Sequence, residues 1–283
     1  MSTETITTIT KKSRSSFYYS FNLLPREQRE AIYTVYAFCK KTDDIVDEHN
    51  GSIHEKERLL TKWRQEFERS ITGESSSSLL NKLSHTAQQF EIPVEHFSEL
   101  IQGVEMDLNK NRYATFNDLY TYCYRVASTV GLMCAEIFGY TKEHTKQYAI
   151  DLGIALQLTN IIRDVKSDLT RDRIYIPQED LHRFGYSEKD LRNNVYDDRF
   201  VGLMRYEAGR ARSYYEKAND NLAREDEKYF FAARIMEKIY YAILQKIERN
   251  NFNVFDNKIR LSRARQLLIA INIWFSHRIL PVR

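Results

Sequence analysis

The chain has 283 residues, with 42 Lys or Arg against 39 Asp or Glu, a net charge of +3 and a pI of ≈ 8.6. This nearly balanced charge, with its basic residues scattered along the chain, argues against a nucleic-acid-binding protein. Only 9 Gly and 4 Pro are present, and stretches with helical periodicity dominate. The sequence therefore predicts an all-α fold in a single domain that is long enough to bury a large core.

Residues 1–12 are rich in threonine, and we predict a disordered tail there, followed by one domain over residues 13–283. Pro25 and Pro93 each mark the start of a predicted helix. The segment 171–177 breaks the helical pattern and is expected to form a loop over one end of the preceding helix. The expected helices cover, in chain order, about 26–48, 53–71, 79–90, 93–107, 115–138, 143–167, 197–224, 227–250 and 258–279, with short helices near 178 and 187.

The three cysteines, Cys39, Cys123 and Cys134, fall inside predicted helices and lack the spacing of metal ligands. We expect them to be core thiols of a protein in a reducing compartment. The N-terminus lacks the apolar region of a signal peptide, and the apolar run 267–275 is shorter than the roughly 20 residues that span a bilayer. These features predict a cytoplasmic protein and leave peripheral contact with a membrane open.

Two predicted helices carry polar residues at helical spacing within otherwise apolar sequence. Residues spaced three or four apart lie on one face of a helix, so each set forms a stripe. The stripe of the first helix comprises Tyr36, Lys40, Asp43 and Asp47. The stripe of the second helix comprises Gly153, Gln157, Asn160, Asp164 and Asp168.

Each stripe places two carboxylates one helical turn apart, and such like charges repel by roughly 0.2–0.5 kcal/mol even in an isolated helix. Burying them costs far more unless cations compensate the charge. Hard oxygen ligands on facing helices suit Mg²⁺, which takes one or two carboxylates together with phosphate oxygens and water. The two stripes therefore predict a magnesium–diphosphate site, with Mn²⁺ as an alternative metal.

The second stripe discriminates between classes of diphosphate enzyme. Chain-elongating prenyltransferases repeat the adjacent acid pair seen at Asp43 and Asp44, whereas the second stripe has no such pair. Class I terpene cyclases place a hydroxyl residue and then a glutamate after the asparagine, whereas aspartates follow Asn160 at both positions. Neither class fits the pattern.

The chain resembles the squalene/phytoene synthase family, whose members join two prenyl diphosphates head to head. The resemblance covers about residues 13–275 and rests on five motifs that occur in the same order. They are Ser16-Phe-Tyr-x-x-Phe21-x-Leu-Leu-Pro25, Tyr36-Ala-Phe-Cys-Lys-x-x-Asp-Asp-x-Val-Asp47, Tyr122-Cys-Tyr-x-Val-Ala-x-Thr-Val-Gly131, Asn160-Ile-Ile-Arg-Asp-Val-x-x-Asp168 and Arg173-Ile-Tyr-Ile-Pro177.

The resemblance implies a helical bundle of the isoprenoid synthase type with a central apolar cavity. It implies that one allylic diphosphate ionises, that the second attacks it to give a cyclopropyl diphosphate, and that this intermediate rearranges to a linear hydrocarbon. The implied metal ligands are Asp43, Asp47, Asn160, Asp164 and Asp168. The four aspartates and Tyr122 are the implied catalytic residues.

The remaining implied residues bind substrate. Carbocations require apolar walls and aromatic faces, and the predicted stripe of Tyr122, Val126, Thr129 and Met133 would supply part of such a wall. Cationic side chains would bind the diphosphate oxygens. The full substrate-binding set is Ser16, Phe17, Phe21, Tyr36, Lys40, Val126, Gln157, Asn160, Arg163, Arg173, Tyr240 and Arg263.

Two positions depart from the family pattern. Lys40 replaces the usual arginine and so offers a point charge in place of a bidentate fork. Ser128 stands where glycine is usual, and we expect it to add bulk to a helix that faces the substrate tunnel. The segments 106–113 and 122–133 are most like those of bacterial phytoene synthases.

The resemblance favours condensation of two C20 geranylgeranyl diphosphates to phytoene. A C15 farnesyl diphosphate user that makes presqualene diphosphate, squalene or dehydrosqualene remains the alternative, and only squalene formation would require NADPH. A non-catalytic helical scaffold and a phosphatase-like relative also stay open, although all four aspartates are intact. The sequence is silent on the oligomeric state.

Overall fold

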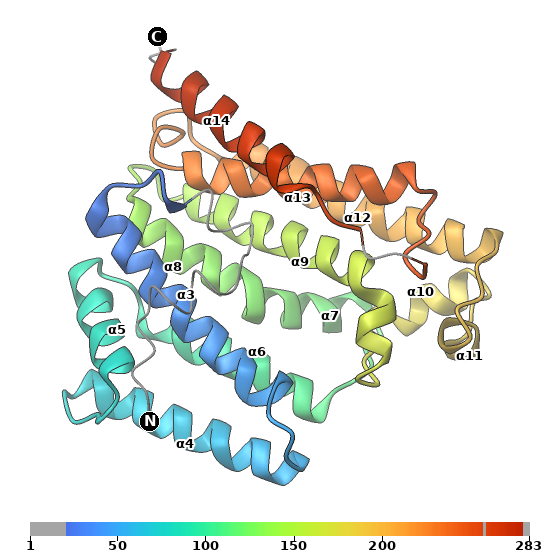
Figure 1. Cartoon of the computed structure of the whole chain (residues 1–283), viewed down its shortest axis with the longest axis horizontal. Helices are drawn as coiled ribbons and strands as arrows, with labels where there is room; N and C mark the ends of the chain where they lie inside the picture. Colours follow the sequence, from blue (N-terminus) through green and yellow to red (C-terminus); the bar gives the residue numbers. More distant parts are fainter. Residues whose placement is uncertain (1–20, 257–258, 280–283) are drawn as a thin grey trace.

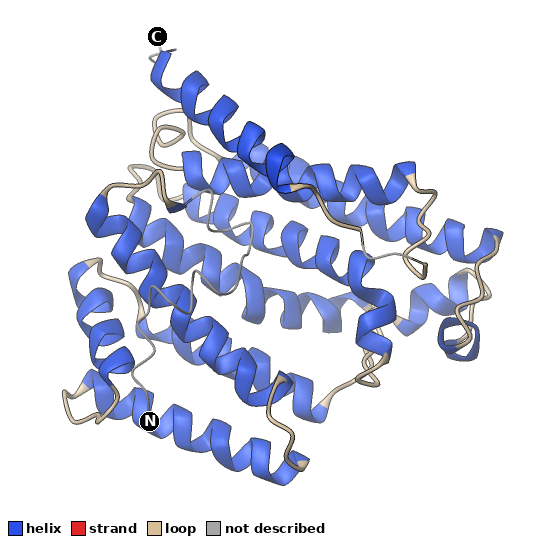
Figure 2. Ribbon diagram, in the orientation of Figure 1, coloured by secondary structure: helices blue, strands red, loops and turns tan. Residues whose placement is uncertain are grey.

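The computed structural model describes residues 21–256 and 259–279, with side chains described as far as 275. Within these ranges all regular elements are helices, apart from one isolated parallel bridge between Arg112 and Ile174 (Figure 2). The all-α prediction is confirmed. The helices are α3 (Arg26–Asp47), α4 (Ile53–Ile71), α5 (Ser78–Gln89), α6 (Val94–Asn109), α7 (Phe116–Cys123), the π-helical segment η1 (Tyr124–Ser128), α8 (Thr129–Phe138), α9 (Thr145–Leu169), α10 (Gln178–Arg183), α11 (Glu188–Arg192), α12 (Asp198–Asn221), α13 (Phe231–Arg249) and α14 (Arg263–Ile279).

Most predicted helices agree with the structure to within a few residues, and two differences stand out. The helix expected at 115–138 is interrupted by η1, and the helix expected from 258 begins at Arg263. The two short helices expected near 178 and 187 are present as α10 and α11. The predicted tail at 1–12 lies outside the described residues.

Several helix starts are fixed by side chains that satisfy the free backbone N–H groups of the first turn. Ser52 and Glu55 form a capping box at the start of α4, and Thr115 and Asp118 form another at the start of α7. The Asp197 carboxylate accepts two backbone N–H groups at the start of α12. These polar residues therefore determine where α4, α7 and α12 begin.

Helix α9 runs through the middle of the molecule, with α13 and α14 above it and α6 and α4 below it in the view of Figure 1. It packs against α12, η1, α8 and α13. Two glycines allow this close packing. A Cβ on Gly153 would lie 2.6 Å from the Cα of Ser128, and a Cβ on Gly131 would lie 2.6 Å from the carbonyl oxygen of Ala149. Glycine at these positions lets η1 and α8 approach the α9 backbone.

Candidate active site

A cavity of ≈ 340 Å³ lies between α3, the η1–α8 segment, α9 and α13. It is lined by both aliphatic and aromatic side chains and by a smaller set of polar ones. The lining residues are Phe21, Ile32, Val35, Tyr36, Cys39, Lys40, Asp43, Val126, Ala127, Val130, Gly131, Cys134, Phe138, Tyr148, Ala149, Leu152, Gly153, Leu156, Gln157, Asn160, Phe230, Ala233, Met236 and Tyr240.

The cavity has an apolar end and a polar end, because the lining changes in the same sense along two helices. Along α3 it passes from Ile32 to Asp43, and along α9 it passes from Tyr148 to Asn160. Phe230 closes the apolar end, with its ring centroid 5.5 Å from that of Tyr148 and 5.5 Å from that of Phe138. Such an elongated, mainly apolar space with polar groups at one end suits a molecule with a hydrocarbon tail and a charged head.

Asn160 supplies an unsatisfied acceptor at the polar end. Its Nδ2 donates to Gln157 Oε1 at 3.4 Å, while its buried Oδ1 lacks a hydrogen-bond partner among the described residues. A buried carbonyl oxygen of this kind is costly unless a ligand or ion pairs with it. The atom therefore points to a bound donor or cation at this end of the cavity.

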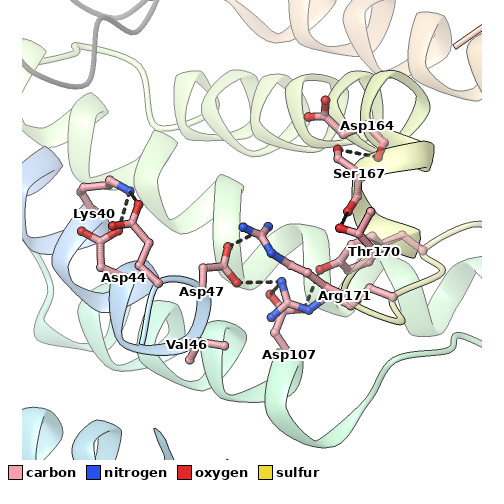
Figure 3. Close-up of polar contacts among 12 residues, drawn as sticks. Lys40, Asp44, Val46, Asp47, Asp107, Asp164, Ser167, Thr170 and Arg171 are labelled. Carbon is pink, nitrogen blue, oxygen red and sulfur yellow. Dashed lines mark hydrogen bonds and ion pairs between the residues drawn. The ribbon is translucent and has the colours of Figure 1, made fainter. Parts of the chain in front are cut away.

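The second aspartate of the α3 stripe lies at the end of that helix and faces a basic loop. Asp47 Oδ1 accepts from Arg173 Nη1 at 2.8 Å, and Asp47 Oδ2 lies 3.4 Å from Arg171 Nη1 (Figure 3). On α9, Asp164 forms a bidentate pair with the neighbouring Arg163. Asp168 and Arg173 line the same small pocket below the α9 C-terminus. The acidic stripes of α3 and α9 thus converge on one loop and do not face opposite sides of the molecule.

Two of these carboxyls are held in surroundings that disfavour their charge. Asp43 lines the cavity, and solvent reaches its side chain there. The surrounding protein is nevertheless the largest cause that raises the pKa of Asp43 to about 7, and the charges of Asp47 and Asp107 add to it. Burial and the charge of Asp164 likewise raise the pKa of Asp168 to about 7. Both groups would regain their charge if a cation bound beside them.

Asp107, on α6, is a site residue that the spacing of the two acidic stripes did not predict. Its Oδ1 accepts from the Tyr175 hydroxyl at 2.7 Å, and its Oδ2 lies 3.1 Å from the Tyr122 hydroxyl and 3.7 Å from Arg173 Nη1. The rings of Tyr122 and Tyr175 stack with centroids 5.0 Å apart. Asp107 follows the buried Leu100 and Val104 at helical spacing, and this position on the apolar face of α6 is the sequence signal that marks it.

The loop that carries the basic residues is fastened to the segment after α6. Ile174 N donates to Asn111 O at 3.0 Å, and Gln178 N donates to Tyr113 O at 2.8 Å. Arg112 Nη1 donates to the Asp172 carbonyl at 2.6 Å. The backbone on both sides of Arg173 is therefore fixed relative to α6.

The predicted site residues fall into three groups. Eight residues line the cavity. Six more lie outside its lining, at the contacts of Asp47, Asp107 and Asp164 or in the small pocket beside Arg173. Arg263 is exposed at the first turn of α14, and Ser16 and Phe17 lie outside the described residues. The eight are Phe21, Tyr36, Lys40, Asp43, Val126, Gln157, Asn160 and Tyr240, and the six are Asp47, Tyr122, Arg163, Asp164, Asp168 and Arg173.

The π-helical segment changes which residues of this region face the cavity. An extra residue in the turn rotates the following helix, so the lining continues from Val126 through Val130 and Cys134. Thr129 and Met133, which the predicted stripe included, are fully buried outside the lining. Of the four residues in the predicted stripe only Val126 lines the cavity. Tyr122 lies at the Asp107 contact, and the prediction for Thr129 and Met133 is wrong because it assumed an uninterrupted α-helix.

Ser128 does not face the cavity either. It is fully buried, its hydroxyl donates to the Ile150 carbonyl at 2.8 Å, and its backbone lies against Gly153. The expectation that it adds bulk to the tunnel is therefore wrong. Its side chain instead joins η1 to α9.

Among the described residues, no three His, Cys, Asp or Glu side chains converge closely enough to form a complete cation site. The donors come instead as pairs on two helices, together with the unsatisfied Oδ1 of Asn160. This arrangement fits Mg²⁺, which commonly takes one or two carboxylates and completes its shell with substrate phosphates and water. The residues present thus fit a divalent ion that binds together with an anionic substrate.

Comparison with known proteins agrees with this geometry. A family model described as squalene/phytoene synthase matches residues 10–265. A 15-cis-phytoene synthase of Synechococcus elongatus is 38% identical over 273 residues, covering 92% of this chain and 88% of the relative. A 15-cis-phytoene synthase of Synechocystis sp. is 36% identical over 284 residues, covering 96% of this chain and 84% of the relative.

Solved structures match over nearly the same extent. A dehydrosqualene synthase in complex with a ligand superposes with a TM-score of 0.86 at 29% identity, covering 97% of this chain and 96% of the other. A squalene synthase from Alicyclobacillus acidocaldarius superposes with a TM-score of 0.75 at 29% identity, covering 86% of this chain and 92% of the other. The helical arrangement around the cavity is therefore similar in these enzymes.

Proposed function

The chain belongs to the squalene/phytoene synthase family, and from this premise we propose that it joins two molecules of geranylgeranyl diphosphate head to head to give phytoene. It is a prenyltransferase with the isoprenoid synthase type of helical fold. We choose geranylgeranyl diphosphate as the substrate because the chain is similar to two 15-cis-phytoene synthases, at 38% and 36% identity over almost its whole length.

The cavity supports a simple placement of the substrates. The apolar end would hold prenyl chains, and the polar end, with Asn160 and Lys40, would hold a diphosphate. Lys40 donates to Asp44 and, at 3.0 Å, to Glu48, so it would exchange a carboxylate partner for a diphosphate oxygen. Arg163 and Arg173 are paired with aspartates in the same way and are further candidates for this exchange.

We assign the metal site to Asp43, Asp47, Asn160, Asp164 and Asp168, with Mg²⁺ as the preferred ion and Mn²⁺ as a substitute. When bound, the ions would neutralise the leaving diphosphate and so favour its departure. The support for this assignment is the unsatisfied Asn160 Oδ1 and the raised pKa values of Asp43 and Asp168.

The reaction that we propose breaks a carbon–oxygen bond of one substrate and leaves an allylic cation. The double bond of the second substrate attacks this cation, a proton is lost, and a cyclopropyl diphosphate results. This intermediate loses its own diphosphate, rearranges, and gives up a second proton to form the linear hydrocarbon. The apolar lining keeps water from the cations, and the faces of Phe21 and Tyr36 stabilise positive charge.

The hydrocarbon product leads us to place the enzyme in the cytoplasm at the surface of a membrane that receives it. No helix in the described part of the chain is long and apolar enough to cross a bilayer. We propose prenyl diphosphates as its small-molecule partners. NADPH enters the proposal only if the product is squalene.

Product identification tests the proposal directly. The purified chain is incubated with Mg²⁺ and either the C20 or the C15 allylic diphosphate, with and without NADPH, and the extracted hydrocarbon is identified by chromatography and mass spectrometry. We expect a C40 product from the C20 substrate that does not depend on NADPH. If only the C15 substrate reacts and the product is a C30 hydrocarbon, the chain is a squalene or dehydrosqualene synthase. Release of a simple prenyl alcohol would indicate a phosphatase-like enzyme.

A further inference from the structure

Helix α14 presents apolar side chains on both of its sides. Its inner side packs on the core through Ile269, Ala270 and Ile273. Its outer side exposes four large apolar residues to solvent. These are Leu267, Leu268, Ile271 and Phe275, which are 46%, 66%, 41% and 49% exposed.

The two sets lie on opposite faces of the helix. With about 100° of rotation per residue, the four outer residues fall within an arc of about 100° and the inner set lies across the axis from them. A surface helix normally turns a polar face to water, and a helix that is apolar all round is normally buried. Figure 1 shows α14 at the edge of the bundle, lying over α13. The outer face of α14 therefore needs a cover that the described part of the chain does not provide.

The charge around this face identifies the chemistry of that cover. After Asp256 the sequence contains no Asp or Glu, whereas it contains Lys258, Arg260, Arg263, Arg265, Arg278 and Arg283. Arg260, Arg263 and Arg265 are exposed, and no acidic side chain of the described residues forms an ion pair with them. At about 100° per residue, Arg263 and Arg265 flank the outer apolar face on its two sides. An apolar stripe between unpaired cations matches an anionic lipid surface.

We propose that α14 docks the protein on an anionic membrane, lying in the plane of the surface with its outer face between the lipid chains. The flanking arginines would reach the headgroup phosphates while their aliphatic stems cover apolar surface. A second copy of this chain is a poorer occupant, because it would bring the same unpaired cations against the first set.

This inference goes beyond the proposed reaction and does not rest on it. Helix α14 also lies close to the cavity. It packs on α13, and α13 supplies Ala233, Met236 and Tyr240 to the cavity lining. A bilayer on the outer face of α14 would lie one helix away from the space that we assign to the hydrocarbon.

Vesicle flotation of the full chain tests the proposal. The probes are vesicles of phosphatidylcholine alone and vesicles of phosphatidylcholine with phosphatidylglycerol. We expect binding to the anionic vesicles that weakens as salt is added. The double variant Leu268→Gln/Phe275→Gln should lower this binding by about tenfold or more, because it removes exposed apolar surface. The double variant Arg260→Gln/Arg265→Gln should lower it by a similar factor on anionic vesicles only.

Ile53→Gln is the matched control, because Ile53 is 60% exposed and lies on α4, across the molecule from α14 (Figure 1). It should bind as the parent does. Thermal melting checks that each variant is folded, and Leu268→Gln alone replaces the double variant if that does not fold. Failure of the parent to bind anionic vesicles, or undiminished binding by the apolar variant, would overturn the proposal. If no vesicle binding occurs and light scattering gives the apolar variant a lower molar mass than the parent, the outer face of α14 binds a second copy of the chain instead. Turnover of detergent-dispersed substrate reports on the reaction separately.

Discussion

Asp107 connects the aromatic wall to the basic loop through contacts to three side chains, Tyr122, Tyr175 and Arg173. Burial raises its pKa, while Arg173 and the tyrosine hydroxyls oppose that rise. Burial and the Asp107 charge also raise the pKa of Tyr122 well above its usual value, so this phenol keeps its proton. Asp107 therefore helps to hold Arg173 beside the two acidic stripes, together with the closer carboxylate of Asp47.

Asp107→Asn should lower turnover by about 10- to 100-fold, because an amide holds Arg173 less firmly and small misplacements near a reacting centre carry penalties of that order. Steady-state kinetics measure the effect, with Asp220→Asn on the exposed side of α12 as the control. The fall should appear mainly in kcat. A loss confined to KM would instead indicate that Asp107 contributes only to substrate binding.

Asp43→Asn should abolish turnover, by at least about 100-fold, because a metal ligand contributes several kcal/mol to transition-state stabilisation. The same change should leave the melting temperature equal or higher, since it removes a carboxyl whose charge the surrounding protein and Asp47 disfavour. Activity assays and calorimetry without added metal measure the two effects. Near-normal turnover would remove Asp43 from the proposed ligand set.

At the scale of single residues, periodicity predicted the cavity-facing positions of α3 and α9 because both helices are uninterrupted. Tyr36, Lys40 and Asp43 on α3, and Gln157 and Asn160 on α9, all line the cavity. Periodicity could not predict the role of Asp107, because no second carboxylate lies one turn away from it on the same face of the helix. Its role depends on contacts with residues far along the chain.

At the scale of helices, the close approach of η1 and α8 to α9 determines the shape of the cavity. The existence of the long helices followed from composition and caps, whereas the π-helical segment Tyr124–Ser128 did not. Such a segment is stabilised by tertiary contacts, here the Ser128 hydroxyl on the Ile150 carbonyl, and local propensity does not encode it. For the same reason the lining of α8 could not be predicted from sequence spacing.

Gly153→Ala should destabilise the protein by about 1–3 kcal/mol, because the added Cβ would lie 2.6 Å from the Ser128 Cα and the backbone of η1 must move. Gly209→Ala is the matched control. Gly209 lies inside α12 with no atom within 4 Å of an added Cβ, so the change should stabilise by about 0.5–1 kcal/mol. Denaturant unfolding measures both. Equal effects of the two changes would refute the role of close packing at Gly153.

At the scale of the whole molecule, one buried acid outside the cavity makes stability depend on pH. Glu207 on α12 pairs with Arg210 at 2.6 Å, while its Oε1 lacks a partner among the described residues. Burial and the neighbouring Asp180 carboxyl raise the pKa of Glu207 to about 7, and Arg210 opposes the rise. Because the folded chain holds this proton more tightly than the unfolded chain, the contribution of Glu207 to stability is complete below pH 4.5 and is lost as the pH rises through 7.

Glu207→Gln stays neutral at every pH, so its stability relative to the parent should increase as the pH rises from about 5 to about 8, by up to roughly 1.4 kcal/mol per unit. Melting temperatures at a series of pH values measure the difference. Glu216→Gln, at an exposed position of the same helix, is the control. A difference that stays constant over this range would show that Glu207 does not titrate there.

The fastening of the 171–177 loop to the segment after α6 has a consequence for how the molecule meets an anion. Arg173 is only 8% exposed, and the backbone on either side of it is bonded to a second element. Its guanidinium is thus preorganised, and the entropy of arranging it is lost once, during folding, and not again at every catalytic cycle. If the proposed diphosphate substrate binds here, it would only have to displace the carboxylates of Asp47 and Asp107 from the Arg173 guanidinium.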